Sequence, residues 1–227
     1  MGTVETEAIV LRTYKLADAD KIVVVLTRDR GLVRGVARGA RRLRSRFGAA
    51  FEPLTEVELA YFEKEGRELA TIKRAEITRS HFALASHPNA WETGERMCAL
   101  AMEFVPPGQV DERVFRLLRA SLETLEKRPS KWAETERYFE VWLLKLCGFW
   151  PDVERCAVCG QALGEGARWS RGRLICKSCG TGTALDRETQ RALLLATRLG
   201  PTEWIEQATA KQVAPLTAEA LALAREK

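Results

Sequence analysis

The sequence predicts an α+β fold, in which a small β-domain of five strands precedes a helical domain that carries an inserted four-cysteine segment. Three observations support this prediction. Short apolar runs separated by glycines and turn residues fill the first eighty positions. Apolar residues then recur with the 3.6-residue period of helices. Finally, two Cys-x2-Cys pairs interrupt the helical part, as in small metal-binding modules.

Five strands are expected in the N-terminal part, with a turn at 63–66 between the last two. The fourth strand alternates strictly, with Val57, Leu59 and Tyr61 on one face, which is typical of an antiparallel strand with one buried face. Five short strands with glycine bends favour a closed barrel of the OB type, and a small open sheet or an SH3-like barrel is the alternative. The expected strands cover residues 8–11, 22–26, 32–37, 55–61 and 69–77.

Helical periodicity begins after Arg79. The first helix is expected to end before Pro106, and the second to begin after Asp111 and end before Pro129. The third is expected to bury Trp142 and Leu146. The expected helices cover residues 91–105, 112–128, 131–147, 186–199 and 217–227. We therefore predict four parts: a barrel (1–79), a first helical part (80–153), a cysteine segment (154–182) and a second helical part (183–227).

The positive charge is concentrated in one short segment. The chain has a net charge of +5, but residues 28–46 contain eight arginines and one acid, so this segment alone carries +7. Such a segment is typical of a surface that binds a polyanion. Guanidinium groups bind phosphate oxygens in a bidentate way, and no base-reading helix is present, so we expect binding that is largely independent of sequence. A solvated charge cluster is the alternative interpretation.

Aromatic side chains near this segment could add base stacking. Each is individually more typical of a core, and Phe47, which adjoins the arginines, is the best exception. The other stacking candidates are Tyr14, Phe51, Tyr61 and Phe62. The two histidines, His81 and His87, are expected to be ordinary surface or helix-start residues.

The cysteine pattern is Cys156-x2-Cys159, sixteen residues, then Cys176-x2-Cys179. Two such knuckles can close one tetrahedral zinc site, and two disulfides or an iron–sulfur cluster are the alternatives. Gly160 and Gly180 follow the knuckles and could adopt positive φ. A hairpin is expected to turn at residues 171–172. With four protein ligands the zinc would be structural, because no coordination position is left open.

No enzyme motif is present: the sequence has no phosphate-binding glycine loop, zinc-protease motif or nucleophile elbow. Asp18 and Asp20 could in principle hold magnesium for a nuclease, although short surface acids at this spacing are commonplace. No secretion signal or membrane-spanning run is visible, so we expect a cytoplasmic protein that does not bind membranes.

The chain resembles the RecO family of bacterial recombination-repair proteins along its whole length. The most specific matching segments are 37–42, which precedes Ser45, and 148–152, which leads to the knuckle at 156–160. Segments 7–11, 26–27, 31–32 and 51–54 also match. The family often has lysine where this chain has Arg38, which preserves the charge, and some relatives lack the cysteines, which supports a structural role for zinc.

The resemblance implies an OB barrel, a helical domain with an inserted zinc ribbon, and no catalysis. It also implies binding and annealing of single- and double-stranded DNA. The expected partners are RecR and single-strand-binding protein and, indirectly, the RecA recombinase, near the nucleoid. The implied DNA-binding residues are Arg34, Arg38, Arg41, Arg42, Arg44 and Arg46, with Lys15, Lys21 and Arg74 as weaker additions. An RNA- or ribosome-associated protein, a metal-dependent nuclease and a pure scaffold are the competing hypotheses.

Overall fold

The computed structural model describes residues 2–64, 66 and 68–226. The chain divides into two compact units, Met1–Ser130 and Lys131–Lys227. The expected turn at 63–66 includes Glu65, which lies outside the described residues. Because the unit boundary falls at Ser130, the first two long helices group with the strands, and the predicted four-part division stays a prediction.

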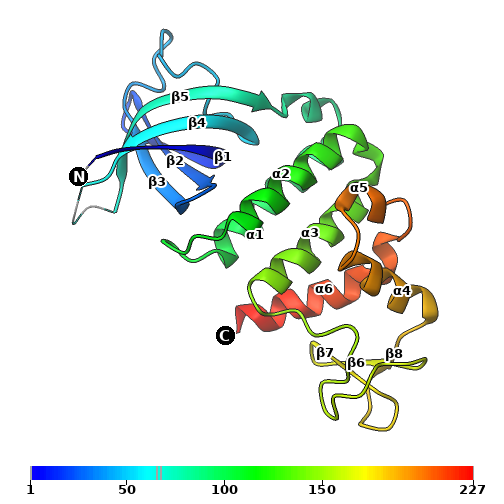
Figure 1. Ribbon diagram of the computed structural model, residues 1–227. Helices are drawn as coiled ribbons and strands as arrows, with labels where there is room; N and C mark the ends of the chain where they lie inside the picture. The colour runs from blue at the N-terminus through cyan, green and yellow to red at the C-terminus, as the bar shows by residue number, and fades with distance from the viewer. Residues whose placement is uncertain (1, 65, 67, 227) are drawn as a thin grey trace. The chain divides into compact units, whose positions relative to one another are not determined.

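Five strands in the first unit form a closed barrel in the order β1-β2-β3-β5-β4 (Figure 1). Closure requires β1 to pair antiparallel with both β2 and β4, while β3 and β5 meet in a short parallel pairing. The predicted number of strands is therefore confirmed. Their bounds are β1 Thr3–Leu16, β2 Asp20–Thr27, β3 Gly31–Ala37, β4 Thr55–Phe62 and β5 Ala70–Ser80.

Strand β1 is much longer than the predicted 8–11. Its first residues pair with β4 from Thr3 onward, and its last residues pair with β2 as far as Leu16. A register shift between Val10 and Arg12 lets one strand bend from one neighbour to the other. Polar residues predominate in both extensions, so the periodicity of apolar residues did not reveal them.

The barrel interior is filled by alternate residues of the strands, including Val57, Leu59 and Tyr61 as predicted. The outer face of β4 was expected to be polar and exposed, and this was wrong for Glu56, which is buried. Its carboxylate contacts His81 and Arg119 rather than water. Burial of a charged group is tolerated here because it is paired.

Two helices, α1 (Pro88–Phe104) and α2 (Glu112–Lys127), complete the first unit, together with the short 3-10 helix η1 (Phe82–Ser86). Helix α1 contacts β1, and the opposed residues Ile9 and Leu26 of β1 and β2 are buried. Asp111 caps α2 by accepting a hydrogen bond from the Arg113 backbone N–H, which explains the predicted start.

The short 3-10 helix η2 (Pro129–Lys131) spans the unit boundary. The second unit contains α3 (Trp132–Leu146), α4 (Arg187–Ala196), α5 (Pro201–Trp204) and α6 (Ala210–Arg225). Short α5 was not predicted. Helix α6 begins earlier than residue 217, because a Thr209–Gln212 capping box starts it and Pro215 lies inside it. Trp142 and Leu146 are only half-buried, whereas Leu143 and Leu144 are fully buried.

The cysteine segment forms a three-stranded sheet in the order β7-β6-β8, lower right in Figure 1. Its strands are β6 Arg168–Ser170, β7 Arg173–Ile175 and β8 Thr183–Ala184. It is attached to its own unit through Trp169, whose indole N–H donates to Glu219 of α6 at 2.9 Å. In the described residues, no helix is long and apolar enough to cross a membrane.

Candidate nucleic-acid interface and metal centre

The arginine loop, defined here as residues 38–48, follows β3 and carries exposed cations. Arg34 on β3 and the loop arginines Arg38, Arg41, Arg42, Arg44 and Arg46 are all exposed. Within the described residues, none of these six guanidinium groups forms an ion pair with a carboxylate. Six cations without a carboxylate partner within thirteen residues can offer guanidinium donors to an external anion.

The positive segment of the sequence is not one surface. Arg28 contacts Glu7 and Glu112, each at 2.9 Å, and Arg30 lies 4.0 Å from Asp29. These two arginines therefore have internal partners and differ from the six that follow them. Within the segment 28–46, the arginines without a carboxylate partner are therefore those of residues 34–46.

One outer face of the barrel continues this surface. Arg12 of β1 and Arg34 of β3 lie directly opposite Val24 of the intervening strand β2, so the three residues form one cross-strand row. In the next row, Tyr14 lies opposite Ile22. The ring of Tyr14 is 43% exposed, and the Arg12 guanidinium lies 5.5 Å from its centroid. Sequence reasoning missed Arg12, because the expected β1 ended before it.

Lys15 and Lys21 are also directly opposed across β1 and β2. Like charges in such a pair repel each other, and an anion held between them would relieve the repulsion. In the structure Lys21 has a partner, Glu52, at 3.8 Å. Arg74, by contrast, pairs with Glu5 at 3.1 Å and Glu76 at 3.4 Å, so its guanidinium is occupied and its predicted DNA role gains no support.

The expectation that Phe47 is a stacking platform was wrong. Phe47 is only 4% exposed and lies in the barrel core, where its ring centroid is 4.8 Å from that of Phe51. Its backbone adjoins the arginines, but its side chain points inward and anchors the loop. Phe51 and Tyr61 are buried as well, which leaves Tyr14 as the most exposed aromatic candidate.

Arg41 has a second role in the structure. Its Nη1 donates to the carbonyl oxygens of Ala17 and Asp18 at 2.9 and 3.1 Å, and its backbone N–H donates to Ala19 at 2.9 Å. The β1–β2 turn is therefore fixed to the arginine loop. Because Arg41 is exposed and these side-chain hydrogen bonds use only its Nη1, it can brace the loop and still offer donors to an anion.

A second charged region lies between the barrel and α2, and we name it the ion-pair network. His81, expected at the surface, is fully buried there, with its ring nitrogens 3.0 Å from Glu56 and 3.2 Å from Glu126. His87, by contrast, is exposed at the start of α1, as predicted. The network comprises Glu7, Arg28, Glu56, Arg79, His81, Glu112, Arg119, Glu123 and Glu126.

Arginine partners shift two carboxyl groups of the network. Burial raises the pKa of Glu56, but the hydrogen bond to His81 and the charge of Arg119 outweigh burial and leave that pKa below its usual value. For Glu7, the hydrogen bond from Arg119 is the largest of the influences that lower the pKa. Both carboxylates therefore stay ionised at neutral pH.

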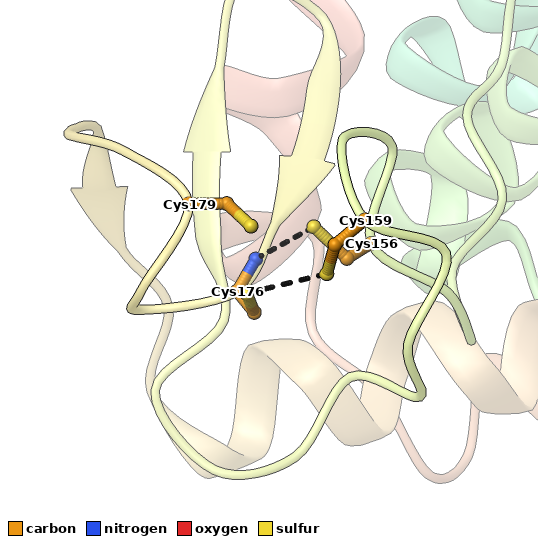
Figure 2. A group of neighbouring side chains, drawn as sticks. All are labelled: Cys156, Cys159, Cys176 and Cys179. Atoms are coloured by element: carbon orange, nitrogen blue, oxygen red, sulfur yellow. Dashed lines mark hydrogen bonds between the residues drawn. The ribbon is translucent and has the colours of Figure 1, made fainter.

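The four predicted cysteine ligands come together, as Figure 2 shows. The sulfurs of Cys156, Cys159, Cys176 and Cys179 all lie within 4.8 Å of one another, and those of Cys159 and Cys176 are 3.8 Å apart. Zinc bonded to four sulfurs at about 2.3 Å places neighbouring sulfurs about 3.8 Å apart. No disulfide joins the four cysteines in the structure, and the mutual spacing of their sulfurs fits four ligands of one metal ion.

Hydrogen bonds shift the pKa values of the thiols in this cluster in opposite directions. Backbone N–H groups of Cys159 and Cys176 lower the pKa of Cys156 to about 6. A hydrogen bond with Ser178 lowers the pKa of Cys176. Hydrogen bonds to Cys176 and Cys159 raise the pKa of Cys179 to about 12. The sulfurs therefore share protons unevenly, and a divalent cation would take the place of those protons.

The knuckle backbone matches the prediction in part. Gly160 has a φ of +71° and donates its N–H to the Cys156 carbonyl, whereas Gly180 is not among the positive-φ glycines, so that expectation was wrong. The side chain of Ile175 lies 3.2 Å from where a Cβ of Gly180 would be, so close packing explains this glycine better. The hairpin does turn at Arg171 and Gly172, both with positive φ, as predicted.

Comparison with known proteins covers almost the whole chain. Residues 1–81 match the family described as Recombination protein O N terminal, and residues 89–219 match Recombination protein O C terminal. A DNA repair protein RecO from Nocardioides sp. (strain ATCC BAA-499 / JS614) is 36% identical over 214 residues, which cover 91% of this chain and 87% of that protein. The protein of the same name from Rubrobacter xylanophilus is 36% identical over 79% of this chain and 72% of its own length. That from Koribacter versatilis is 37% identical over 72% of this chain and 66% of its own length.

Proposed function

Because this chain belongs to the RecO family of DNA repair proteins, we propose that it is a non-catalytic protein that binds DNA and anneals complementary strands. We propose the OB type for its barrel, since the strands close in the order β1-β2-β3-β5-β4 around one core. The DNA would lie along the arginine loop and the outer face formed by β1, β2 and β3.

One observation carries this proposal: six neighbouring arginines have no carboxylate partner in the described part of the chain. An exposed guanidinium that only improves solubility is usually interspersed with acids, as elsewhere in this protein. The row formed by Arg12, Val24 and Arg34 supports the same surface. Tyr14 adds an exposed aromatic ring on which a base could stack.

Annealing by this surface would be electrostatic. Two DNA strands repel each other through their phosphates, and the loop cations would screen that repulsion while holding both strands close enough for bases to pair. The protein need not read the sequence, because the pairing of the bases itself selects the complement. The contacts would therefore be mainly to phosphates and independent of sequence.

Salt dependence tests the proposal. If about six phosphates are contacted, the logarithm of the affinity for single-stranded DNA falls with the logarithm of salt concentration at a slope near −4. Replacing Arg41, Arg42 and Arg44 together with alanine should flatten that slope to about −2 and slow annealing. Fluorescence anisotropy across a salt series measures the slope, and a slope unchanged in the triple variant would overturn the placement.

A matched control removes the same charge elsewhere. Arg187, Arg191 and Lys211 are exposed cations of α4 and α6 in the second unit. Replacing these three with alanine should leave the slope near its wild-type value. Equal losses from both triple variants would mean that binding follows net charge rather than the arginine loop.

We propose that Cys156, Cys159, Cys176 and Cys179 hold a structural zinc ion. The four sulfurs and their spacing support this metal. Its binding, on the order of 10 kcal/mol, would fold a segment with little apolar core of its own.

Metal analysis should find one zinc per chain, lost in Cys159→Ser and kept in Cys147→Ser. Chelation should expose Trp169, which is buried, while DNA binding by the first unit largely persists. Absence of zinc, or complete loss of DNA binding on chelation, would contradict this division.

The family name also suggests the setting. We propose that the protein acts with RecR and single-strand-binding protein in the cytoplasm, at the nucleoid, and promotes loading of RecA onto DNA. A pull-down with RecR, combined with annealing of DNA coated by single-strand-binding protein, tests these partners. No association with either protein would reduce the proposal to DNA binding alone.

A further inference from the structure

Leu43 is the most exposed large apolar residue of the described chain. Its relative exposure is 108%, whereas the next most exposed, Phe82, reaches 66%. A single exposed leucine is common on protein surfaces and needs no explanation by itself. The position of this one is unusual, because it lies between Arg42 and Arg44 in the segment richest in unpaired cations.

The loop that presents Leu43 is braced on both sides. Successive turns are closed by hydrogen bonds from the Arg42 N–H to the Gly39 carbonyl (3.1 Å) and from the Ser45 N–H to the Arg42 carbonyl (2.9 Å). Arg41 fixes one side to the β1–β2 turn, and buried Phe47 fixes the other in the barrel core. The Leu43 side chain therefore projects into solvent from a loop whose backbone is fixed by hydrogen bonds and by the buried Phe47.

The cations around Leu43 determine what it can meet. Arg42 and Arg44 are exposed and have no carboxylate partner in the part of the chain that the structure describes. A phosphate chain held by these two guanidinium groups would bring its sugars and bases against the side chain between them. A leucine side chain cannot form hydrogen bonds with phosphates. Its transfer from water to the apolar faces of bases is favourable, because apolar surface is then buried.

We propose that Leu43 inserts between neighbouring bases of the bound single strand and separates them. This inference rests on the proposed function and deepens it, since it adds a contact to bases where the arginines supply contacts to phosphates. Apolar side chains placed between base steps unstack them in other DNA-binding proteins. Here the separated bases would be presented for pairing with a second strand. The buried state of Phe47 and Phe51 strengthens the assignment, because the loop offers no aromatic ring for this task.

The test uses the full-length protein and single-stranded DNA that carries one 2-aminopurine, whose fluorescence rises when its neighbours unstack. Wild-type protein at saturation should raise the fluorescence, and Leu43→Ala should abolish most of that rise. The affinity of Leu43→Ala should fall by about tenfold, because burial of one leucine side chain is lost. The slope with salt should stay at its wild-type value, because no charge is removed.

Two further variants separate the wedge from a general effect. Leu43→Met keeps an apolar side chain of similar volume and should retain the fluorescence rise. Val158→Ala truncates another exposed aliphatic side chain, on the cysteine segment, and should behave like wild type. Because Leu43 and Val158 are both exposed, all variants should have wild-type melting temperatures. A loss of the fluorescence rise then cannot be ascribed to misfolding.

The outcomes distinguish the two proposals. If wild-type protein binds DNA with an arginine-dependent slope but gives no fluorescence rise, or if Leu43→Ala gives the full rise, the wedge is overturned and the proposed function stands. If the wild-type protein does not bind single-stranded DNA even at low salt, both are overturned. Loss of the rise in Leu43→Ala alone, with Leu43→Met intact, supports the wedge.

Discussion

Two groups of arginines in the first unit have opposite surroundings. In the ion-pair network, Arg28, Arg79 and Arg119 each contact two carboxylates. In the arginine loop, the five arginines contact none among the described residues. The same side chain therefore joins α2 to the barrel in one place and is left available in the other. The two regions differ in their acids: α2, β1 and β4 provide carboxylates to the network, and residues 38–48 contain none.

The largest effect should come from breaking the network at Arg119. Replacing Arg119 with alanine leaves buried Glu56 with one cationic neighbour fewer and should lower the free energy of unfolding by about 3 kcal/mol. This is the lower end of the usual range, because the Arg119 side chain is 30% exposed. Urea unfolding followed by circular dichroism measures the loss. DNA affinity measured well below the melting temperature should be unchanged, and a loss above tenfold would place Arg119 on the DNA surface instead.

Substitutions in the arginine loop should have the opposite pattern, with a large loss of DNA affinity and a small loss of stability. The Arg41, Arg42 and Arg44 triple alanine variant should lose about a hundredfold in DNA affinity at low salt, equivalent to about 2.7 kcal/mol. Its unfolding free energy should change by no more than about 1 kcal/mol, a loss that comes mainly from the hydrogen bonds of Arg41 to the β1–β2 turn. Measuring both quantities on one preparation tests the comparison directly. A stability loss as large as that of Arg119→Ala would show that the loop arginines serve the fold.

Acid should weaken the network selectively. Because the pKa values of Glu56 and Glu7 are lowered in the folded protein, their contribution to stability is complete above the ordinary carboxyl value of 4.5 and is lost as pH falls through the folded values. His81, Arg119 and Arg79 act on the Glu56 carboxylate, and Glu126 contacts the other ring nitrogen of His81. Glu56→Gln should therefore reduce the steepness of the acid-induced loss, seen in melting temperatures from pH 7 to pH 3. Glu58→Gln, at an exposed position of the same strand, is the control, and identical profiles for both variants would contradict this account.

The smallest effect is expected at Arg74. Like the arginines of the ion-pair network it contacts two carboxylates, but its pairs lie at the exposed surface. Its pairs with Glu5 and Glu76 are more than half exposed, so Arg74→Ala should cost at most about 1 kcal/mol of stability. Its DNA affinity should change less than about twofold. Competition binding against wild type detects such a difference, and a clearly larger loss would return Arg74 to the DNA surface.

The sequence predicted features that depend on near neighbours. The five strands, the start of α2 at Asp111, the hairpin at Arg171 and Gly172 and the clustering of four cysteines all follow from residues within about twenty positions of each other. Knuckle spacing alone is enough to bring two sulfurs to the same side of an ion.

Features that depend on distant partners were missed or wrong. His81 meets Glu56 and Glu126, which lie 25 and 45 residues away, and nothing near His81 in the sequence indicates either of them. Phe47 was placed beside the arginines because its backbone is there, but the direction of its side chain depends on the barrel interior. Arg12 became visible only when the register of β1 against β2 was known. The assignment of DNA-binding residues stays a prediction.

On the proposed DNA surface, Lys21 is already paired with a carboxylate of the same chain. The carboxylate of Glu52 lies 3.8 Å from the Lys21 ammonium, where it offsets the repulsion from Lys15. A phosphate that reaches Lys21 must compete with this tethered anion. Part of the free energy gained when a phosphate binds Lys21 would thereby be offset, and release would be faster than from an unpaired lysine. In the proposed annealing role, a strand would leave this site by exchange with the tethered Glu52 carboxylate, and the Lys21 ammonium would not be left without a counter-ion.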